Sequence, residues 1–289
     1  MTSHDVVQRV RRIFGIRQVG HTGTLDPIAS GVLIVLVGSA TRIAQFLQED
    51  DKEYHLTLKL GLETDTQDIT GKVLGENDPS AVRREDLEKA ANAYLGTFSQ
   101  APPPFSAVKH AGQPLYRLAR KGVRVEVEPR KVTIYRIGVH DWRVPRVSLE
   151  VVCSKGTYMR TLCHDIGQDL GVGGCMESLV RIRSGMFTLK DAVDLEELAA
   201  DPGPERWLRE AARGLKFPVV EPEDEELGVL VDGGEIPWTG SGRKGNVSVT
   251  RKGKLIALAR IKDGNGVMTL APVKVLEPRF KELFKDYEK

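Results

Sequence analysis

Apolar residues recur at helical spacing in three stretches of the chain. The first lies between Ser3 and Gly15 and predicts an amphipathic helix with Ser3 as its N-cap. A second helix is predicted over residues 84–95, with Gly96 closing it. The third follows Thr157, and its apolar face consists of Met159, Leu162, Cys163, Ile166 and Leu170.

Other stretches alternate between apolar and polar residues and predict half-buried strands. Tyr54, Leu56, Leu58 and Leu60 share one face of such a strand. Residues 146–152 alternate as well, and residues 246–250, 255–261 and 267–275 are predicted strands separated by turn residues. Helical and alternating segments follow one another irregularly and not as βαβ repeats, which predicts an α+β fold with a mixed or antiparallel central sheet and flanking helices.

Changes in composition predict the domain organisation. Residues 101–129 are rich in proline, glycine and basic residues, which is typical of an exposed excursion from a sheet. A break at residues 201–204 begins a linker-like segment with a short helical piece at 205–212. We therefore expect one large domain over residues 1–213 and a small β module over residues 214–289.

Composition excludes several classes of protein. Of the 289 residues, 40% are hydrophobic and 28% charged, as in ordinary soluble proteins. The longest apolar run, residues 32–37, is too short to span a bilayer, and the N-terminal segment lacks the apolar core of a signal peptide. We expect a cytoplasmic protein. Its three cysteines, Cys153, Cys163 and Cys175, form no CxxC pair, so neither a disulfide framework nor a zinc site is indicated.

The net charge of +2 is too small to indicate nucleic acid, but the basic residues are clustered. An acidic group at residues 221–226 offsets them in the total. One cluster is Arg9, Arg11, Arg12 and Arg17, and the other is Arg117, Arg120, Lys121, Arg124, Arg130 and Lys131. Such clusters either follow a phosphate backbone or form solvated faces.

Candidate chemistry lies in the segment GHTGTLDPIASGVLIVLVGSATR, residues 20–42, which displays one aspartate, Asp26, in a glycine-rich loop. Gly20 and Gly23 permit backbone angles that other residues avoid, and Pro27 pushes Asp26 out of helical geometry. A carboxylate aimed in this way indicates a nucleophile. The alternative is a simple Asp-Pro turn in which Asp26 caps neighbouring amides.

This segment resembles the catalytic motif of the bacterial tRNA pseudouridine synthases that modify the TΨC-loop uridine, the tRNA pseudouridine-55 synthase family. Further blocks resemble that family in the same order. They are Lys52-Glu53-Tyr54, residues 61–71 (GLETDTQDITG), residues 103–120 (PPFSAVKHAGQPLYRLAR) and residues 153–167 (CSKGTYMRTLCHDIG). The resemblance covers the first two hundred residues strongly and the remainder loosely.

The resemblance implies a fold and an activity. The central sheet would be of the pseudouridine synthase type, residues 101–129 would grip RNA, and residues 214–289 would form a PUA-like RNA-binding β-barrel. The reaction would isomerise uridine-55 of the tRNA T loop to pseudouridine. It involves no redox change or net hydrolysis, so no cofactor is required. The target base must be flipped out of its folded loop.

The resemblance also assigns roles to residues. Asp26 would be the nucleophile, at C6 of the base or C1′ of the sugar. Tyr54 would lie against the flipped uracil and take part in removing the C5 proton. Arg160 would pair with Asp26, since an adjacent guanidinium favours the charged carboxylate. His21 would occupy space near the vacated base. Tyr158 and Leu179 would complete the pocket wall, and Lys109 would position RNA phosphate.

Other acidic and histidine residues fit structural roles better. Asp68 suits loop capping, so a second catalytic carboxylate is not established. For His164 and Asp165, core and capping roles are favoured over a metal site or a catalytic triad. In the resembled family a strand and a lysine-proline-glycine turn precede the segment that begins here at Thr2, so the chain is either truncated or natively short, and we expect an exposed sheet edge.

The expected partner is the tRNA T-stem-loop, with no membrane and no obligatory protein partner. Two alternatives stay open. A guide-RNA-dependent pseudouridine synthase shares the aspartate motif, and a non-catalytic tRNA-binding or folding factor would use the same surface.

Overall fold

Two groups of chain segments form separate compact units in the computed structural model. The model describes residues 1–277 except 124, 126, 202, 241–243 and 265. The central unit consists of residues 25–32 and 49–192. The terminal unit consists of residues 1–24, 33–48 and 193 onward.

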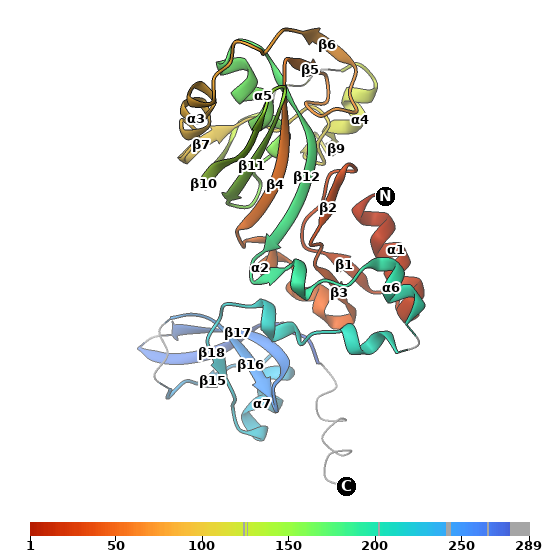
Figure 1. The fold of residues 1–289 in the computed structure, drawn as a ribbon. Coiled ribbons are helices and arrows are strands. Elements are labelled where there is room, and N and C mark those ends of the chain that lie inside the picture. Colours follow the sequence, from red (N-terminus) through yellow and green to blue (C-terminus); the bar gives the residue numbers. More distant parts are fainter. Residues whose placement is uncertain (124, 126, 202, 241–243, 265, 278–289) are drawn as a thin grey trace. The chain divides into compact units, whose positions relative to one another are not determined.

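Seven strands of the central unit form one mixed sheet (Figure 1). The strands are β2 (Ala29–Gly31), β4 (Lys52–Leu60), β7 (Gly96–Gln100), β10 (Arg130–Arg143), β11 (Arg146–Cys153), β12 (Gly174–Ser184) and β13 (Phe187–Thr188). Their order is β13-β12-β4-β11-β10-β7, and β2 also pairs with β12. The β2–β12 pair is parallel and the other pairs are antiparallel, which confirms the predicted mixed sheet.

Two helices cover one face of this sheet, α3 (Arg84–Asn92) and α5 (Met159–Asp169). The apolar side chains of β4 alternate with polar ones as predicted, and they pack against both helices in a single core. The second predicted helix was too long: α3 ends at Asn92, and Leu95 is 46% exposed. Gly96, with φ of 90°, begins β7 and is not the helix cap.

Smaller elements border the sheet. They are β5 (Leu62–Thr64), β6 (Val73–Glu76), β8 (Lys109–His110), β9 (Gln113–Pro114), α4 (Leu115–Arg120) and the 3-10 helix η2 (Leu189–Asp191). The segment 101–129 is only partly the exposed excursion that its composition predicts, because Pro103, Ser106 and Leu115 are buried. Among the described residues, helices lack the length and apolar character that crossing a membrane needs.

The N-terminal part of the terminal unit begins with a capped helix. Its elements, with those of residues 193–214, are α1 (Ser3–Phe14), β1 (Val19–His21), β3 (Val35–Val37), η1 (Gly38–Ile43), α2 (Ala44–Gln48), α6 (Leu195–Ala200), η3 (Pro204–Trp207) and η4 (Ala211–Gly214). The N-cap of α1 is Thr2 and not Ser3, because Thr2 and Asp5 form a capping box. Two short 3-10 helices replace the helical piece expected at 205–212.

A five-stranded sheet forms the C-terminal part of the terminal unit. Its elements are β14 (Val219–Val220), α7 (Asp224–Val231), β15 (Ile236–Pro237), β16 (Gly245–Arg251), β17 (Lys254–Gly264) and β18 (Val267–Val275). The three long strands confirm the strands predicted at residues 246–250, 255–261 and 267–275. The order is β14-β16-β17-β18-β15, and no pairing within the described part of the chain joins β14 to β15. The expected closed barrel is therefore an open sheet in the described residues.

The central position of β4 generates a stability prediction. Leu58 is fully buried on β4, so Leu58→Ala should lower the free energy of unfolding by about 2–5 kcal/mol. Leu95→Ala is the matched control, and its effect should stay within about 0.5 kcal/mol because Leu95 is exposed. Urea titration followed by circular dichroism measures both, and equal losses would contradict the arrangement of this core.

Candidate active site

Asp26 lies in a tight turn that leads into β2. The Ala29 amide donates a hydrogen bond to the Asp26 carbonyl oxygen at 2.9 Å, which closes the turn around Pro27. Proline favours the second position of such turns because its ring fixes φ. The backbone of Asp26 is thus held in place directly before a strand of the central sheet.

The end of β2 is fixed to β12 through Arg181. The Val32 amide donates to the Arg181 carbonyl oxygen at 2.8 Å, and Arg181 Nε donates to the Val32 carbonyl oxygen at 2.7 Å. Gly31 has φ of 98°, and a Cβ there would lie 2.3 Å from the Arg181 carbonyl oxygen. Glycine is required at this position by both backbone angle and space, whereas Gly20 has no positive φ. Of the two glycines that the sequence pointed to, Gly23 has a positive φ of 156° and Gly20 does not.

Arg160 and Asp26 form a two-pronged ion pair. Arg160 Nε donates to Asp26 Oδ2 at 3.0 Å, and Nη2 donates to Oδ1 at 2.9 Å. The Arg160 side chain is 6% exposed and the Asp26 side chain 26% exposed. The guanidinium is therefore buried behind the carboxylate, and the carboxylate keeps access to solvent. This parallel geometry fixes the carboxylate plane more firmly than a single contact would.

The remaining donors of Arg160 bind backbone carbonyl groups from two other segments. Nη1 donates to the Thr66 carbonyl oxygen at 3.1 Å, and Nη2 donates to the Phe105 carbonyl oxygen at 3.0 Å. Because Arg160 stands on the first turn of α5, it joins that helix to the Asp26 turn, to the loop after β5 and to the 101–129 segment. A buried guanidinium needs such partners to offset its desolvation.

A second carboxylate, that of Asp68, lies near Arg160. Its Oδ2 is 3.7 Å from Arg160 Nη1, and its side chain is 7% exposed. Asp68 Oδ1 accepts hydrogen bonds from the Thr70 amide at 3.0 Å and from the Thr66 hydroxyl at 2.9 Å. These bonds agree with the loop-capping role expected for Asp68 from the sequence. The structure adds a contact with the Arg160 guanidinium.

Tyr54 is buried on β4, opposite Arg181 of β12 in the strand register. Burial raises the pKa of Tyr54 to about 12, while the charge and hydrogen bond of Arg181 act in the opposite direction. The charge of Asp26 also contributes to raising this pKa, which places the carboxylate within electrostatic reach of the phenol. At neutral pH Tyr54 is therefore a neutral phenol.

Tyr158 and Leu179 occupy elements next to the ion pair. Tyr158 is the N-cap residue of α5, and burial is the main cause that raises its pKa. Leu179 is 5% exposed on β12, where it pairs with Ala29 of β2 and with Leu56 of β4. Both residues thus belong to the same unit as Asp26.

Two further predicted substrate-binding residues lie on other elements. His21 lies in β1 of the terminal unit, where its Nδ1 accepts a hydrogen bond from the Gly23 amide at 3.3 Å. Lys109 is exposed in β8, part of a short hairpin, and it has no hydrogen bond or ion pair to Asp26 or Arg160.

One group of side chains has the residue types of a metal site. His55, His140 and Glu150 present ligand atoms within 4.8 Å of one another. Glu150 also pairs with Arg136, and the His140 contact together with Arg136 lowers the pKa of Glu150. The Arg136 guanidinium thus already balances the negative charge of Glu150.

The three cysteines, Cys153, Cys163 and Cys175, are buried free thiols. Burial raises the pKa of each, as expected for structural cysteines.

Sequence reasoning missed Arg181 and Lys52. Both are buried, and burial followed by the Arg181 charge lowers the pKa of Lys52. The available signal was a charged residue within the apolar alternation of a central strand. Arg181 follows Leu179 by two positions, so both fall on one face of β12. Backbone acceptors such as the Phe105 carbonyl carry no signal in the sequence.

Comparisons with known proteins show the family of the chain. The model of the TruB family pseudouridylate synthase N-terminal domain matches residues 11–159, and that of the tRNA pseudouridylate synthase B C-terminal domain matches residues 160–213. A protein of Symbiobacterium thermophilum named tRNA pseudouridine synthase B is 52% identical over 215 residues, which cover 73% of this chain and 71% of that protein. A protein of Moorella thermoacetica with the same name is 42% identical over 292 residues, which cover 96% of each.

Solved structures show the same fold. A chain in the crystal structure of a Cbf5-Nop10-Gar1 complex superimposes with a TM-score of 0.73 at 27% sequence identity. The superposition covers 96% of this chain and 82% of that chain. Family models that together match residues 11–213 and relatives above 40% identity establish the membership. The chain belongs to the TruB family of pseudouridylate synthases.

Proposed function

We propose that this chain isomerises uridine-55 in the T loop of tRNA to pseudouridine. The observation that carries the proposal is the two-pronged pair of Asp26 and Arg160, in which a partly exposed carboxylate is held by a buried guanidinium. The family models and the relatives named tRNA pseudouridine synthase B support the same activity.

The reaction breaks the bond between C1′ and N1, turns the uracil and joins C5 to C1′. C5 gives up its proton and N1 takes one up, so atoms and electrons balance without a co-reactant. Asp26 supplies the nucleophilic carboxylate, at C6 or at C1′, which divides one difficult step into two. Arg160 orients that carboxylate through both oxygens. The proposal therefore requires no cofactor, and every group it uses belongs to this chain or to the RNA.

Tyr54 contributes as a neutral phenol against the flipped uracil. Because its pKa is about 12, its hydroxyl keeps its proton throughout the neutral range. A contact surface with a hydrogen-bonding hydroxyl agrees with this state. Direct removal of the C5 proton by Tyr54 would require the ionised phenol, which burial disfavours.

The remaining assignments concern RNA binding. Tyr158 and Leu179 would form the pocket wall, His21 would fill the place of the flipped base, and Lys109 would contact phosphate. The segment 101–129 would grip the T-stem-loop, and its link to Arg160 through the Phe105 carbonyl supports this. The division into a catalytic domain over 1–213 and a PUA-like RNA-binding domain over 214–289 stays a prediction.

The test is tritium release from C5-labelled uridine in an unmodified tRNA transcript. Release by the chain alone supports a synthase without an obligatory protein partner, while the cytoplasmic location stays a prediction. A requirement for added guide RNA would favour the guide-dependent alternative. Binding of tRNA without release would favour a binding or folding factor. A transcript with cytidine at position 55 is the substrate control and should release nothing.

Asp26→Asn should abolish tritium release, because an amide is no nucleophile at this step. Its affinity for tRNA should stay within about threefold of the parent, since one side chain of the same size is exchanged. Filter binding measures the affinity. Measurable turnover by the variant would contradict the role of Asp26.

Arg160→Lys should lower kcat by at least about a hundredfold, because a lysine ammonium cannot hold both carboxylate oxygens and the two backbone carbonyl groups together. Arg84→Lys is the matched control, since Arg84 forms an exposed ion pair with Glu88. It should leave kcat unchanged. Single-turnover kinetics separates the two, and an equal response of both variants would refute the positioning role.

The raised pKa of Tyr54 predicts alkaline sensitivity. The unfolded phenol ionises near pH 10.0 and the folded one near 12, so between these values the folded state binds more protons. Stability should therefore fall by about 1.4 kcal/mol per pH unit in this window, and Tyr54 adds no pH dependence below it. Urea titrations of the parent and of Tyr54→Phe at a series of pH values isolate the contribution of Tyr54. The free energy of unfolding should fall more steeply with pH in the parent than in the variant, and parallel curves would show that Tyr54 has an ordinary pKa.

A further inference from the structure

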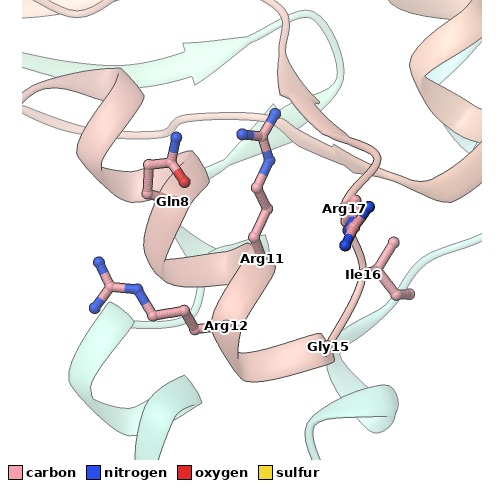
Figure 2. Close-up of a pocket in the computed structure, with 6 residues that line it drawn as sticks. All are labelled: Gln8, Arg11, Arg12, Gly15, Ile16 and Arg17. Atoms are coloured by element: carbon pink, nitrogen blue, oxygen red, sulfur yellow. The ribbon is translucent and has the colours of Figure 1, made fainter.

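A pocket of about 520 Å³ lies at the C-terminal end of α1. Figure 2 shows its lining: Gln8, Arg11 and Arg12 project from the helix, and Gly15, Ile16 and Arg17 follow on the chain that leaves it. Gly15 ends the helix in the left-handed conformation, with φ of 64°. Arg17 follows this turn by two residues, and Figure 2 shows its side chain on the opposite side of the view from Arg12.

The lining contains three guanidinium groups and no carboxylate. Neither Arg12 nor Arg17 forms an ion pair with any residue that the structure describes, and both are exposed. Arg9, on the same helix, is by contrast paired with Glu196. The positive charge that this helix leaves uncompensated is therefore concentrated at the pocket.

Arg11 is the inner member of the group. Its Nη2 donates to the Val19 carbonyl oxygen at 3.1 Å, which fixes the side chain against β1. Its Nε is buried and has no hydrogen-bond partner among the described residues. A buried N–H of a charged group without an acceptor is costly, but this Nε is closed to solvent, so a ligand would be bound by the exposed Arg12 and Arg17.

The helix dipole explains only part of this arrangement. Basic residues in a last turn interact favourably with the free carbonyl groups, which accounts for Arg11 and Arg12. Arg17 lies beyond the helix and adds a third like charge, which is unfavourable unless an anion compensates it.

We propose that this pocket binds a phosphate of the substrate RNA backbone. Guanidinium groups match phosphate oxygens with paired hydrogen bonds, and the Gln8 amide adds a further donor. The exposed rim of Arg12 and Arg17 leaves the site open to a continuous chain of nucleotides. The inference rests on the proposed function for its partner and adds a specific contact, on the terminal unit, that positions the RNA.

The test measures binding of a fluorescent unmodified tRNA transcript by anisotropy. Arg12→Gln and Arg17→Gln should each raise Kd roughly tenfold, because each removes a charged hydrogen bond to phosphate. A double variant that combines Arg12→Gln with Arg17→Gln loses the phosphate contact. In this double variant the slope of log Kd against log salt should become shallower by about 0.7–0.9. Arg12→Lys and Arg17→Lys, which keep the charge, should lose less affinity and keep the slope.

Arg209→Gln is the matched control. Arg209 is an exposed arginine of the terminal unit outside the pocket, and its Nη1 donates to the Arg206 and Leu208 carbonyl oxygens. Its loss removes one positive charge from the same unit and should leave both Kd and the salt slope near those of the parent.

Equal losses in the pocket variants and in Arg209→Gln would overturn the proposal, because they would reflect overall charge alone. Inorganic phosphate is the second probe: protection of Arg12 and Arg17 from an arginine-modifying dicarbonyl by millimolar phosphate but not by tRNA would assign the pocket to a free anion. Binding is measured without turnover, so it is independent of whether tritium is released. If tRNA binding depends on Arg12 and Arg17 but no tritium is released, the proposed function is refuted and the phosphate-binding role of the pocket is supported.

Discussion

The pairing of one buried guanidinium with one half-exposed carboxylate organises the central unit. Arg160 contacts Asp26 with two nitrogens and completes its hydrogen bonding with carbonyl groups of Thr66 and Phe105. An arginine cannot shed its proton to relieve the cost of burial, so its neighbours have to supply the acceptors. The chain satisfies this requirement by bringing three segments, distant in sequence, to the first turn of α5.

Strand β12 supports that arrangement from the sheet. It pairs with β4, β13 and β2, and β2 directly follows the turn that holds Asp26. The Arg181 side chain closes the far end of β2, while its backbone approaches Gly31 too closely for any side chain there. The direction of the Asp26 carboxylate thus depends on a parallel strand pair in a sheet that is otherwise antiparallel.

The sequence predicted the features that follow from periodicity and from the resemblance. Alternation identified β4, and runs of strand-forming residues between turns identified the long C-terminal strands. The motif blocks identified the Asp26–Arg160 pair. Periodicity failed at Leu95 because a helical pattern does not reveal where the hydrogen bonds end. Arg181 and the Phe105 carbonyl could not be found, since the first looks like a surface charge and the second is backbone. The sequence could not show whether the C-terminal sheet closes into a barrel, because closure depends on how its short outer strands pair.

The hydrogen bond from Arg160 to the Phe105 carbonyl makes the nucleophile sensitive to its surroundings. Phe105 belongs to the 101–129 segment, and its backbone shares the same Nη2 group that holds Asp26 Oδ1. The two N–H groups of Nη2 serve the neutral oxygen and the charged one at the same time. The segment and the carboxylate are therefore mechanically linked through one nitrogen atom, and a displacement of several residues can be converted into a change in the direction of a single side chain.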